Sequence, residues 1–218
     1  MSRRKLVILG AGDLGREILY AAREGCERFS GCSYEGSCFI DEDPEKLSTG
    51  LEGLKILSYE ELPAELCDRS DVICAVGSPA DREKMVRRAL EVAPQASFAR
   101  VIHSSAVLMP GVELGAGTFV APGATIAIAS KLADHVLINQ GALIGHDCSI
   151  GDFSVICPGV ILSGRTQISA GAFLGSGALT YPGVRIGRGC TASALATLSR
   201  HLKDGKKAIA KPNLMIID

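Results

Sequence analysis

The four histidines of this sequence differ in the chemistry that their neighbours permit. His146 is followed directly by Asp147. A neutral imidazole poised near pH 7 suits a general base, so His146 is the first candidate for a catalytic group. The alternative is a solvated histidine at a turn. His103 and His201 are expected to be structural or solvated, whereas His135 could serve either purpose.

A second candidate site is a glycine-rich turn near the N-terminus. Gly10, Gly12 and Gly15 form the pattern GxGxxG, which follows an apolar β-branched run at residues 5–9 and precedes a helical pattern. In this context the pattern indicates a phosphate bound near a helix N-terminus. Asp41 could be the acid that holds the ribose of NAD, but it lies 31 residues after Gly10, where about 20 is usual. A purely structural turn is the other alternative.

The elements that position this turn are expected to alternate between strand and helix. Further strands are predicted at residues 37–40 and 71–76, and a charged amphipathic helix at residues 80–92. Such alternation favours a small parallel sheet that binds ligands at the carboxyl ends of its strands. The residues at these ends include Gly12, Asp41 and Gly77.

Residues 102 to 191 contain His146 and repeat every six positions. From Ile102 to Ile186 every sixth residue is aliphatic except Thr180, and the residue four positions beyond each is small or β-branched. This spacing places both side chains on one face of a short strand. Of the fifteen positions that lie three residues after an aliphatic position, nine are glycine, which sharp corners favour. The pattern predicts a parallel β-helix of triangular coils rather than a sandwich with regular turns.

Several stretches together resemble one known family. The glycine turn, the segments 40–46 and 75–84, and the segment 101–106 that leads into the hexads are similar to those of the hexapeptide-repeat sugar acetyltransferases. This family includes nucleotide-sugar N-acetyltransferases of the bacillosamine and perosamine pathways and the sialic-acid O-acetyltransferases. The resemblance covers about residues 6 to 189.

The resemblance implies two domains and the handedness of the β-helix. Residues 1–100 would form a small α/β half-Rossmann domain that binds a nucleotide sugar. Residues 101–218 would form a left-handed parallel β-helix, the acyltransferase domain, with a C-terminal tail. Handedness follows only from the resemblance, because crossover connections are normally right-handed.

The resemblance also implies an activity. The chain would be an acyltransferase that moves an acetyl group from acetyl-CoA to the amino group of a nucleotide-linked amino sugar, as a homotrimer with active sites between neighbours. Direct attack is expected, because no Cys or Ser lies where an acyl-enzyme would need it. Sialic-acid-type O-acetylation and a non-catalytic sugar-nucleotide-binding relative are the alternatives. The residues that match the family's nucleotide-sugar contacts are Gly12, Asp13, Leu14, Asp41, Glu42 and Gly77.

The catalytic assignments come from the same resemblance. The segment 144–152 is similar to the family's catalytic hexad, in which the histidine, here His146, deprotonates the acceptor and the next carboxylate, here Asp147, orients it. Asn139 matches a polar residue near the reacting amine. Gly164 and Arg165 lie one coil above the pair. In the family, the backbone at the position of Gly164 contacts acetyl-CoA. Arg165 could pair with Asp147 or reach a phosphate. The cofactor-binding positions expected here are Gly164, Arg165, Ser176 and Val155.

The sequence departs from the family at three places. Leu14 and Val155 stand where some relatives have histidine, and Ala210-Lys211-Pro212-Asn213 replaces the usual Gly-x-Pro-Ala near the end.

Composition and spacing exclude other classes of protein. The net charge is −1 and there is no basic run, so no nucleic-acid partner is expected. The longest apolar stretches are too short to span a bilayer and the N-terminus lacks a signal peptide's apolar region, so we expect a cytoplasmic protein without a membrane partner. The γ-class carbonic anhydrases use the same prism, but the separation of His135 and His146 does not match their zinc histidines, so no metal is expected.

Overall fold

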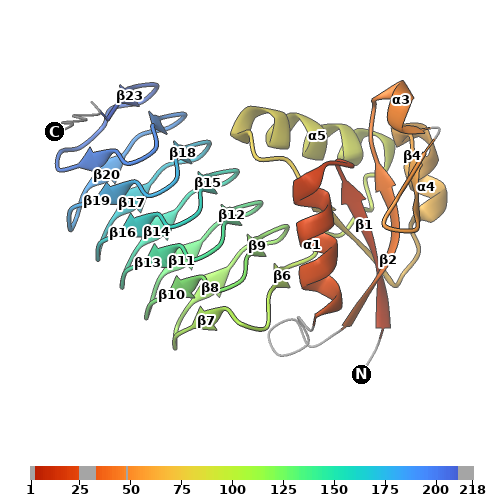
Figure 1. Cartoon of the computed structure of the whole chain (residues 1–218), viewed down its shortest axis with the longest axis horizontal. Coiled ribbons are helices and arrows are strands. Elements are labelled where there is room, and N and C mark those ends of the chain that lie inside the picture. Colours follow the sequence, from red (N-terminus) through yellow and green to blue (C-terminus); the bar gives the residue numbers. More distant parts are fainter. Residues whose placement is uncertain (1–2, 25–32, 48, 211–218) are drawn as a thin grey trace, which may run out of the picture.

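A computed structural model describes residues 3–24, 33–47 and 49–210 of the chain. Figure 1 shows two parts side by side, an α/β unit and a stack of coils. The α/β unit contains β1 (Arg3–Leu9), α1 (Asp13–Arg23), β2 (Ser33–Ile40), α3 (Pro44–Leu47), β3 (Gly50–Leu51), β4 (Leu54–Leu57), a 3-10 turn η1 (Tyr59–Glu61), α4 (Leu62–Glu65), β5 (Ser70–Cys74) and α5 (Pro79–Val92).

The sheet of the α/β unit has the order β3-β4-β2-β1-β5. The pairs β1–β2 and β1–β5 are parallel, as predicted. β4, which was not predicted, is parallel to β2, and β3 runs antiparallel to β4, so the sheet is mixed. The β3–β4 hairpin was not predicted. Its turn consists of Glu52 and Gly53, both with positive φ, which is the geometry of a tight hairpin.

The two long helices cover opposite faces of this sheet. Ile18 and Leu19 of α1 belong to the same buried cluster as Leu6 and Ile8 of β1. Side chains of α5 such as Val86 pack on the other face, in a cluster with residues of β1, β2 and β5. Each helix begins just after the carboxyl end of a strand, α1 after β1 and α5 after β5.

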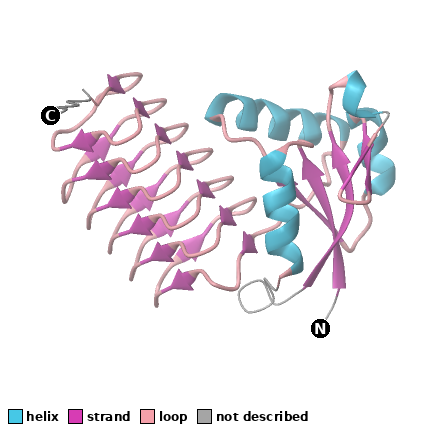
Figure 2. Cartoon of the chain, viewed as in Figure 1, coloured by secondary structure: helices cyan, strands magenta, loops and turns pink. Residues whose placement is uncertain are grey.

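The coils form a left-handed parallel β-helix with three faces (Figure 1, Figure 2). One face, called here the covered face, comprises β6 (Val101–Ile102), β9 (Phe119–Val120), β12 (Leu137–Ile138), β15 (Val155–Ile156), β18 (Phe173–Leu174), β21 (Thr191–Ala192) and β23 (Lys207–Ala208). The apolar face comprises β7 (Val107–Leu108), β10 (Thr125–Ile126), β13 (Leu143–Ile144), β16 (Ile161–Leu162), β19 (Leu179–Thr180) and β22 (Thr197–Leu198). The polar face comprises β8 (Glu113–Leu114), β11 (Lys131–Leu132), β14 (Ser149–Ile150), β17 (Gln167–Ile168) and β20 (Arg185–Ile186).

The hexad register predicted the interior of the prism. Its core is built from the aliphatic positions, such as Ile126, Ile144 and Leu162, together with small residues such as Ala124 and Ala142. The fourteen predicted corner positions from Gly111 to Gly189 have positive φ. Five of them are not glycine, namely Ala129, His135, Asp147, Phe153 and Arg165.

The prism extends beyond the predicted stretch. Leu198 and Ala208 continue the strands past residue 191. The last coil is two residues shorter than the others, because Ile186 bridges Leu202 and Thr191 pairs with Lys207. The departure predicted at residues 211–213 lies outside the described residues.

The α/β unit packs against the covered face. Phe119, Leu137 and Val155 point outward from this face into the buried cluster that contains α1. The side-chain amide of Gln140 donates to the Glu17 carboxylate of α1 at 2.8 Å. In the described part of the chain, no helix is long and apolar enough to cross a membrane.

Candidate active site

His146 and Asp147 occupy the corner between the apolar and polar faces. The Nδ1 atom of His146 lies 2.7 Å from Oδ2 of Asp147, and the two side chains are 47% and 56% exposed. When Nδ1 carries its proton toward the carboxylate, Nε2 has a free lone pair at an accessible corner. The pair therefore has the geometry of an oriented base.

The backbone of the next coil lies against the imidazole ring. A Cβ atom added to Gly164 would lie 2.4 Å from Nε2 of His146, so only glycine fits here without displacing the ring. The N–H of Arg165 donates to the carbonyl of His146 at 2.8 Å. Gly164 thus lies directly above the ring, as coil spacing predicted.

Hydrogen bonds inside the prism fix the backbone of the corner that carries His146. The Ser130 hydroxyl donates to the Gly145 carbonyl at 2.8 Å and accepts the Cys148 N–H at 3.1 Å. The Cys148 thiol is buried against the carbonyls of His146 and Ser163, and burial raises its pKa. A buried thiol with a raised pKa is a poor nucleophile.

Arg165 occupies the same corner one coil above Asp147. Asp147 and Arg165 have φ of 54° and 61°, and the neighbouring strands pair in register at Ser149 and Gln167. Among the described residues, Asp147 has an ion pair with His146 and none with Arg165. The exposed guanidinium of Arg165 is therefore left to another partner.

The six predicted nucleotide-binding residues line one pocket of about 430 Å³ at the carboxyl ends of β1, β2 and β5. We call it the glycine-turn pocket. Its lining comprises Gly10, Ala11, Gly12, Asp13, Leu14, Asp41, Glu42, Lys46, Ala75, Val76, Gly77 and Met85.

The glycines near this pocket are required for different reasons. Gly10 has φ of +104°, which favours glycine, and a Cβ atom on Gly15 would lie 2.5 Å from the Gly10 carbonyl oxygen. Gly12 and Gly77 have neither constraint, since a Cβ atom on either would meet no other atom within 4 Å. The fold therefore does not need glycine at these two positions. Because Gly12 and Gly77 lack a side chain, a ligand can approach their backbone closely.

Asp41 holds the glycine turn and stays ionised. Its carboxylate accepts from the Ala11 N–H at 2.9 Å and the Asp43 N–H at 3.0 Å, and pairs with Lys46 at 3.0 Å. Burial alone would raise the pKa of Asp41, but these hydrogen bonds and the Lys46 charge hold it below its usual value. Glu42, beside it, forms an ion pair with Arg88.

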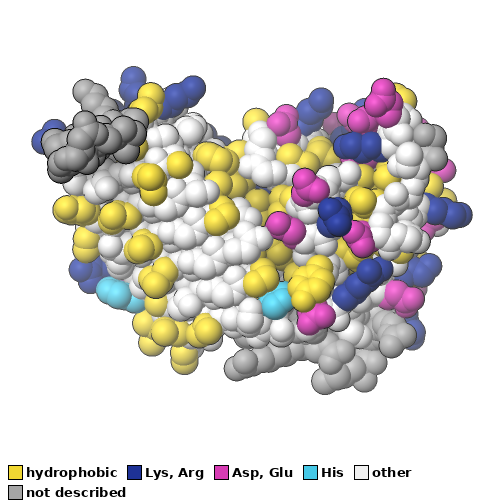
Figure 3. Space-filling view, viewed as in Figure 1, with side chains coloured by type: hydrophobic (Ala, Val, Ile, Leu, Met, Phe, Trp, Pro, Cys, Tyr) yellow, Lys and Arg dark blue, Asp and Glu magenta, His cyan; other side chains and the backbone are white. Residues whose placement is uncertain are grey.

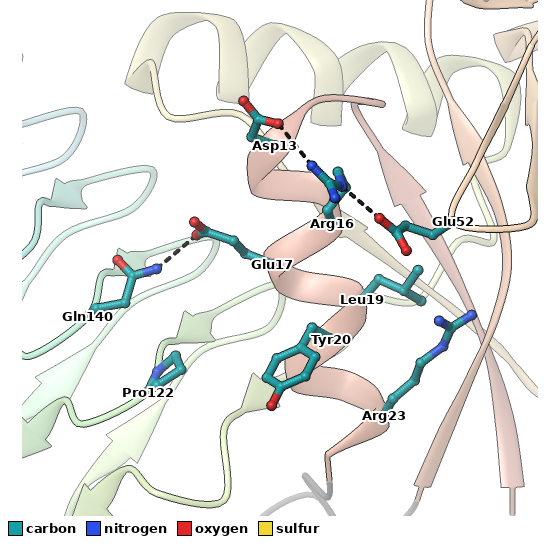
Figure 4. A pocket seen from close by; sticks show the side chains of 9 residues that line it. All are labelled: Asp13, Arg16, Glu17, Leu19, Tyr20, Arg23, Glu52, Pro122 and Gln140. Carbon is teal, nitrogen blue, oxygen red and sulfur yellow. Dashed lines mark hydrogen bonds and ion pairs between the residues drawn. The ribbon is translucent and has the colours of Figure 1, made fainter.

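A larger pocket of about 630 Å³ lies between α1 and the prism (Figure 4). Asp13 lines it and the glycine-turn pocket alike, so the two lie next to each other along the helix. Arg16 bridges Asp13 and Glu52 across its wall, and Gln140 reaches Glu17 from the prism corner. Tyr20 lies on the helix farther from Asp13.

The remaining predicted site residues do not join His146 within one chain. Asn139 and Ser176 lie at the corner between the covered and apolar faces, one side of the prism away from His146. Val155 is only 1% exposed, in the cluster between the two units. Its side chain packs against the α/β unit and offers no surface to a cofactor.

The other histidines have structural contacts. His135 is buried, stacks on Phe153 and meets Phe98 edge-on. His103 contacts the Ser105 hydroxyl, and the exposed His201 accepts the N–H of Arg185. Within the described ranges, no group of three or more His, Cys, Asp or Glu side chains could hold a metal ion.

Sequence reasoning missed Arg82. This arginine of α5 is fully buried and hydrogen-bonded to the carbonyls of Val76 and His135. Its position in a charged amphipathic pattern gave no signal of burial.

Comparisons with known proteins agree with the geometry. Residues 5–89 match the PglD N-terminal domain family. GDP-perosamine N-acetyltransferase of Escherichia coli O157:H7 is 24% identical over 180 residues, which are 81% of this chain and 78% of that protein. The structure of PerB from Caulobacter crescentus, solved with CoA and GDP-perosamine, is 30% identical with a TM-score of 0.81 and covers 94% of this chain and 93% of its own. The chain belongs to the hexapeptide-repeat family of bacterial nucleotide-sugar acetyltransferases.

A further member of this family has been solved with the acyl donor. The acetyltransferase domain of PglB from Neisseria gonorrhoeae, in complex with acetyl coenzyme A, is 28% identical with a TM-score of 0.84. The alignment covers 97% of this chain and 98% of that one. Family membership confirms the predicted fold and the predicted enzyme class, an acyltransferase.

Proposed function

We propose that this acetyltransferase moves the acetyl group of acetyl-CoA to the amino group of a nucleotide-linked sugar, with His146 as general base. The observation that carries the proposal is the His146–Asp147 pair, which leaves Nε2 free at an accessible corner beneath Gly164. PerB, solved with CoA and GDP-perosamine, supports the classes of both substrates.

The reaction requires one proton acceptor at the corner. The sugar amine attacks the thioester carbonyl, a C–N bond forms, and Nε2 of His146 takes the amine proton. The C–S bond breaks and the CoA thiolate leaves, and the proton held on Nε2 of His146 passes to it, which gives the free thiol and restores the neutral imidazole. Asp147 keeps Nδ1 protonated and stabilises the imidazolium that forms.

The nucleotide part of the acceptor is assigned to the glycine-turn pocket. The N-terminus of α1 opens into this pocket with Gly12 as its cap and no side-chain hydrogen bond to its free N–H groups. Such an end favours a diphosphate, and the bare Gly12 and Gly77 allow close approach. The neighbouring pocket along α1 gives the attached sugar room to extend from Asp13 toward the prism.

Assembly is needed to complete this site. In a three-sided prism, the corner of His146 lies opposite the covered face, against which the α/β unit packs. A substrate in the glycine-turn pocket therefore cannot reach His146 of the same chain, and a neighbouring chain must supply the base. The predicted homotrimer would do so.

The apolar face offers the surface for this association. Val107, Leu143 and Ile161 of this face are 49%, 47% and 46% exposed. Figure 3 shows hydrophobic side chains exposed along the coils. Glu113, Lys131 and Gln167 occupy the equivalent positions of the polar face. Packing of the apolar face against a second copy would bury these side chains beside the corner of His146.

A substrate screen tests the proposed reaction. Release of free CoA thiol is measured with acetyl-CoA and UDP-, GDP- or CMP-linked sugars, each carrying either an amino group or only hydroxyl groups. We expect turnover with an amino sugar. Turnover only with hydroxyl acceptors would assign O-acetylation instead, and binding of a nucleotide sugar without any thiol release would identify a non-catalytic relative.

A further inference from the structure

Thr180 departs from the hexad register in the second coil above His146, one coil beyond that of Gly164. Every other equivalent position from Ile102 to Ile186 is aliphatic, whereas Thr180 places a hydroxyl group in the interior of the prism. Thr180 and the nearby Thr166 are both completely buried. Burying hydroxyl groups among aliphatic side chains costs free energy unless they are hydrogen-bonded, so their contacts need an explanation.

The two hydroxyls form a closed ring with the backbone of Ser163. The Ser163 N–H donates to Oγ1 of Thr180 at 3.1 Å. The hydroxyl oxygens of Thr180 and Thr166 lie 2.8 Å apart, and Thr166 donates to the Ser163 carbonyl at 2.7 Å. Each polar atom of the ring therefore has a partner.

This ring replaces a bond of the ladder between coils. At the equivalent step one coil below, the N–H of Gly145 donates to the Leu162 carbonyl at 2.7 Å, and one coil above, Tyr181 donates to Leu198 at 2.9 Å. Throughout the coils that the structure describes, the other equivalent N–H groups also reach a carbonyl. Ser163 alone among them reaches a side chain.

The substituted bond lies next to the imidazole. Ser163 directly precedes Gly164, whose missing Cβ leaves the space occupied by Nε2 of His146. The Ser163 carbonyl, which accepts the Thr166 hydroxyl of the ring, belongs to the Ser163–Gly164 peptide, so the ring holds that peptide in place. That peptide forms the wall against which Nε2 is placed.

We propose that Thr180 is a positioning residue for His146, acting through Thr166 and the Ser163–Gly164 peptide. The inference rests on the proposed role of His146 as the base. Stability does not explain the hydroxyl, because valine has nearly the same shape and would restore both the aliphatic register and the ladder carbonyl as acceptor.

The test is Thr180→Val, with steady-state kinetics and thermal unfolding measured on the intact protein. We expect kcat to fall about tenfold, since small displacements of a catalytic group cost one to two orders of magnitude, with both KM values within twofold of wild type and an unchanged or higher Tm. Thr180→Ser keeps the hydroxyl and should restore kcat. Thr166→Val breaks the same ring and should lower kcat in the same direction.

Thr118→Val is the matched control. Thr118 is another completely buried threonine, and its hydroxyl contacts the Ala133 carbonyl, away from the corner of His146. It should leave kcat unchanged.

Several outcomes would overturn the inference. These are a wild-type kcat in Thr180→Val, a rise in KM alone, or a loss that serine does not restore. If His146→Ala itself left the rate unchanged, the proposed function would fail. A dead His146→Ala together with a normal Thr180→Val would remove only the role of Thr180.

Discussion

Arg82 Nε donates a 2.7 Å hydrogen bond to the backbone carbonyl of His135, across the boundary between the α/β unit and the prism. The same guanidinium donates through Nη1 to the Val76 carbonyl at 3.0 Å. Val76 lines the glycine-turn pocket. One buried cation therefore connects α5, the carboxyl end of β5 and a corner of the prism.

Replacing Arg82 should loosen that connection. Arg82→Ala would leave a cavity and two buried carbonyls without their donor, so we expect the free energy of unfolding to fall by about 3–5 kcal/mol. Urea unfolding measures the change. Arg87→Ala is the control, because Arg87 lies on the same helix, is 71% exposed and pairs only with Glu83 among the described residues. Equal stability losses in the two variants would contradict the assigned role of Arg82.

His135 should make stability depend on pH. Burial, followed by the nearby Arg82 charge, lowers the pKa of His135 from 6.5 to about 4. The unfolded chain therefore binds this proton more tightly than the folded protein does. The stabilisation is complete above pH 6.5 and is lost as the pH falls toward 4, a change of about 3 kcal/mol.

His135→Asn tests this assignment. Asparagine tolerates the positive φ of 58° at this corner, so the substitution removes the titrating group while the backbone is kept. Unfolding free energies between pH 4 and 7 should vary less in the variant than in wild type. His201→Asn should keep the wild-type slope, and an unchanged slope in His135→Asn would refute the prediction.

The bare glycines of the glycine-turn pocket give a second test of binding. Gly12→Ala meets no atom in the fold, so Tm should change by no more than a few degrees while KM for the nucleotide sugar rises. Gly15→Ala is the contrast, because its Cβ would lie 2.5 Å from the Gly10 carbonyl oxygen and should destabilise the fold. Thermal shift with NAD in place of the nucleotide sugar should show no stabilisation. Tight NAD binding lost in Gly12→Ala would reassign the pocket.

Arg165 is expected to bind a substrate phosphate, because Asp147 is already paired with His146. Arg165→Gln should raise KM for one of the two substrates about tenfold, the usual effect of losing a charge-assisted hydrogen bond, with little change in kcat at saturation. Unchanged KM values with a kcat–pH profile whose acidic limb moves upward would instead show that Arg165 competes for Asp147.

The repeat was readable from the sequence because each hexad meets the same local requirements. Aliphatic residues fill the interior, and a corner residue with positive φ follows three positions later. Ile144 and Asp147 could therefore be placed without knowledge of the remaining fold. The shorter last coil was not predictable in this way. It depends on how Leu202 docks on Ile186 after the register is lost.

The site was predicted less completely than the fold. The adjacency of His146, Asp147 and Gly164 follows from coil spacing and is present. The burial of Val155 depends on the docking of α1 against the covered face, and such long-range packing leaves no periodic signal. Asn139 lies at another corner of the prism than His146, and the resemblance, which matches residues one by one, gives no distance between them.

His146→Ala in the thiol-release assay tests the central claim most directly. His201→Ala is assayed beside it, since His201 is exposed and lies in the last coil. We predict that kcat with acetyl-CoA and the amino-sugar nucleotide falls by roughly 10²- to 10⁴-fold in His146→Ala, the usual contribution of a general base, and stays at the wild-type value in His201→Ala. A wild-type kcat in a folded His146→Ala protein would contradict the account.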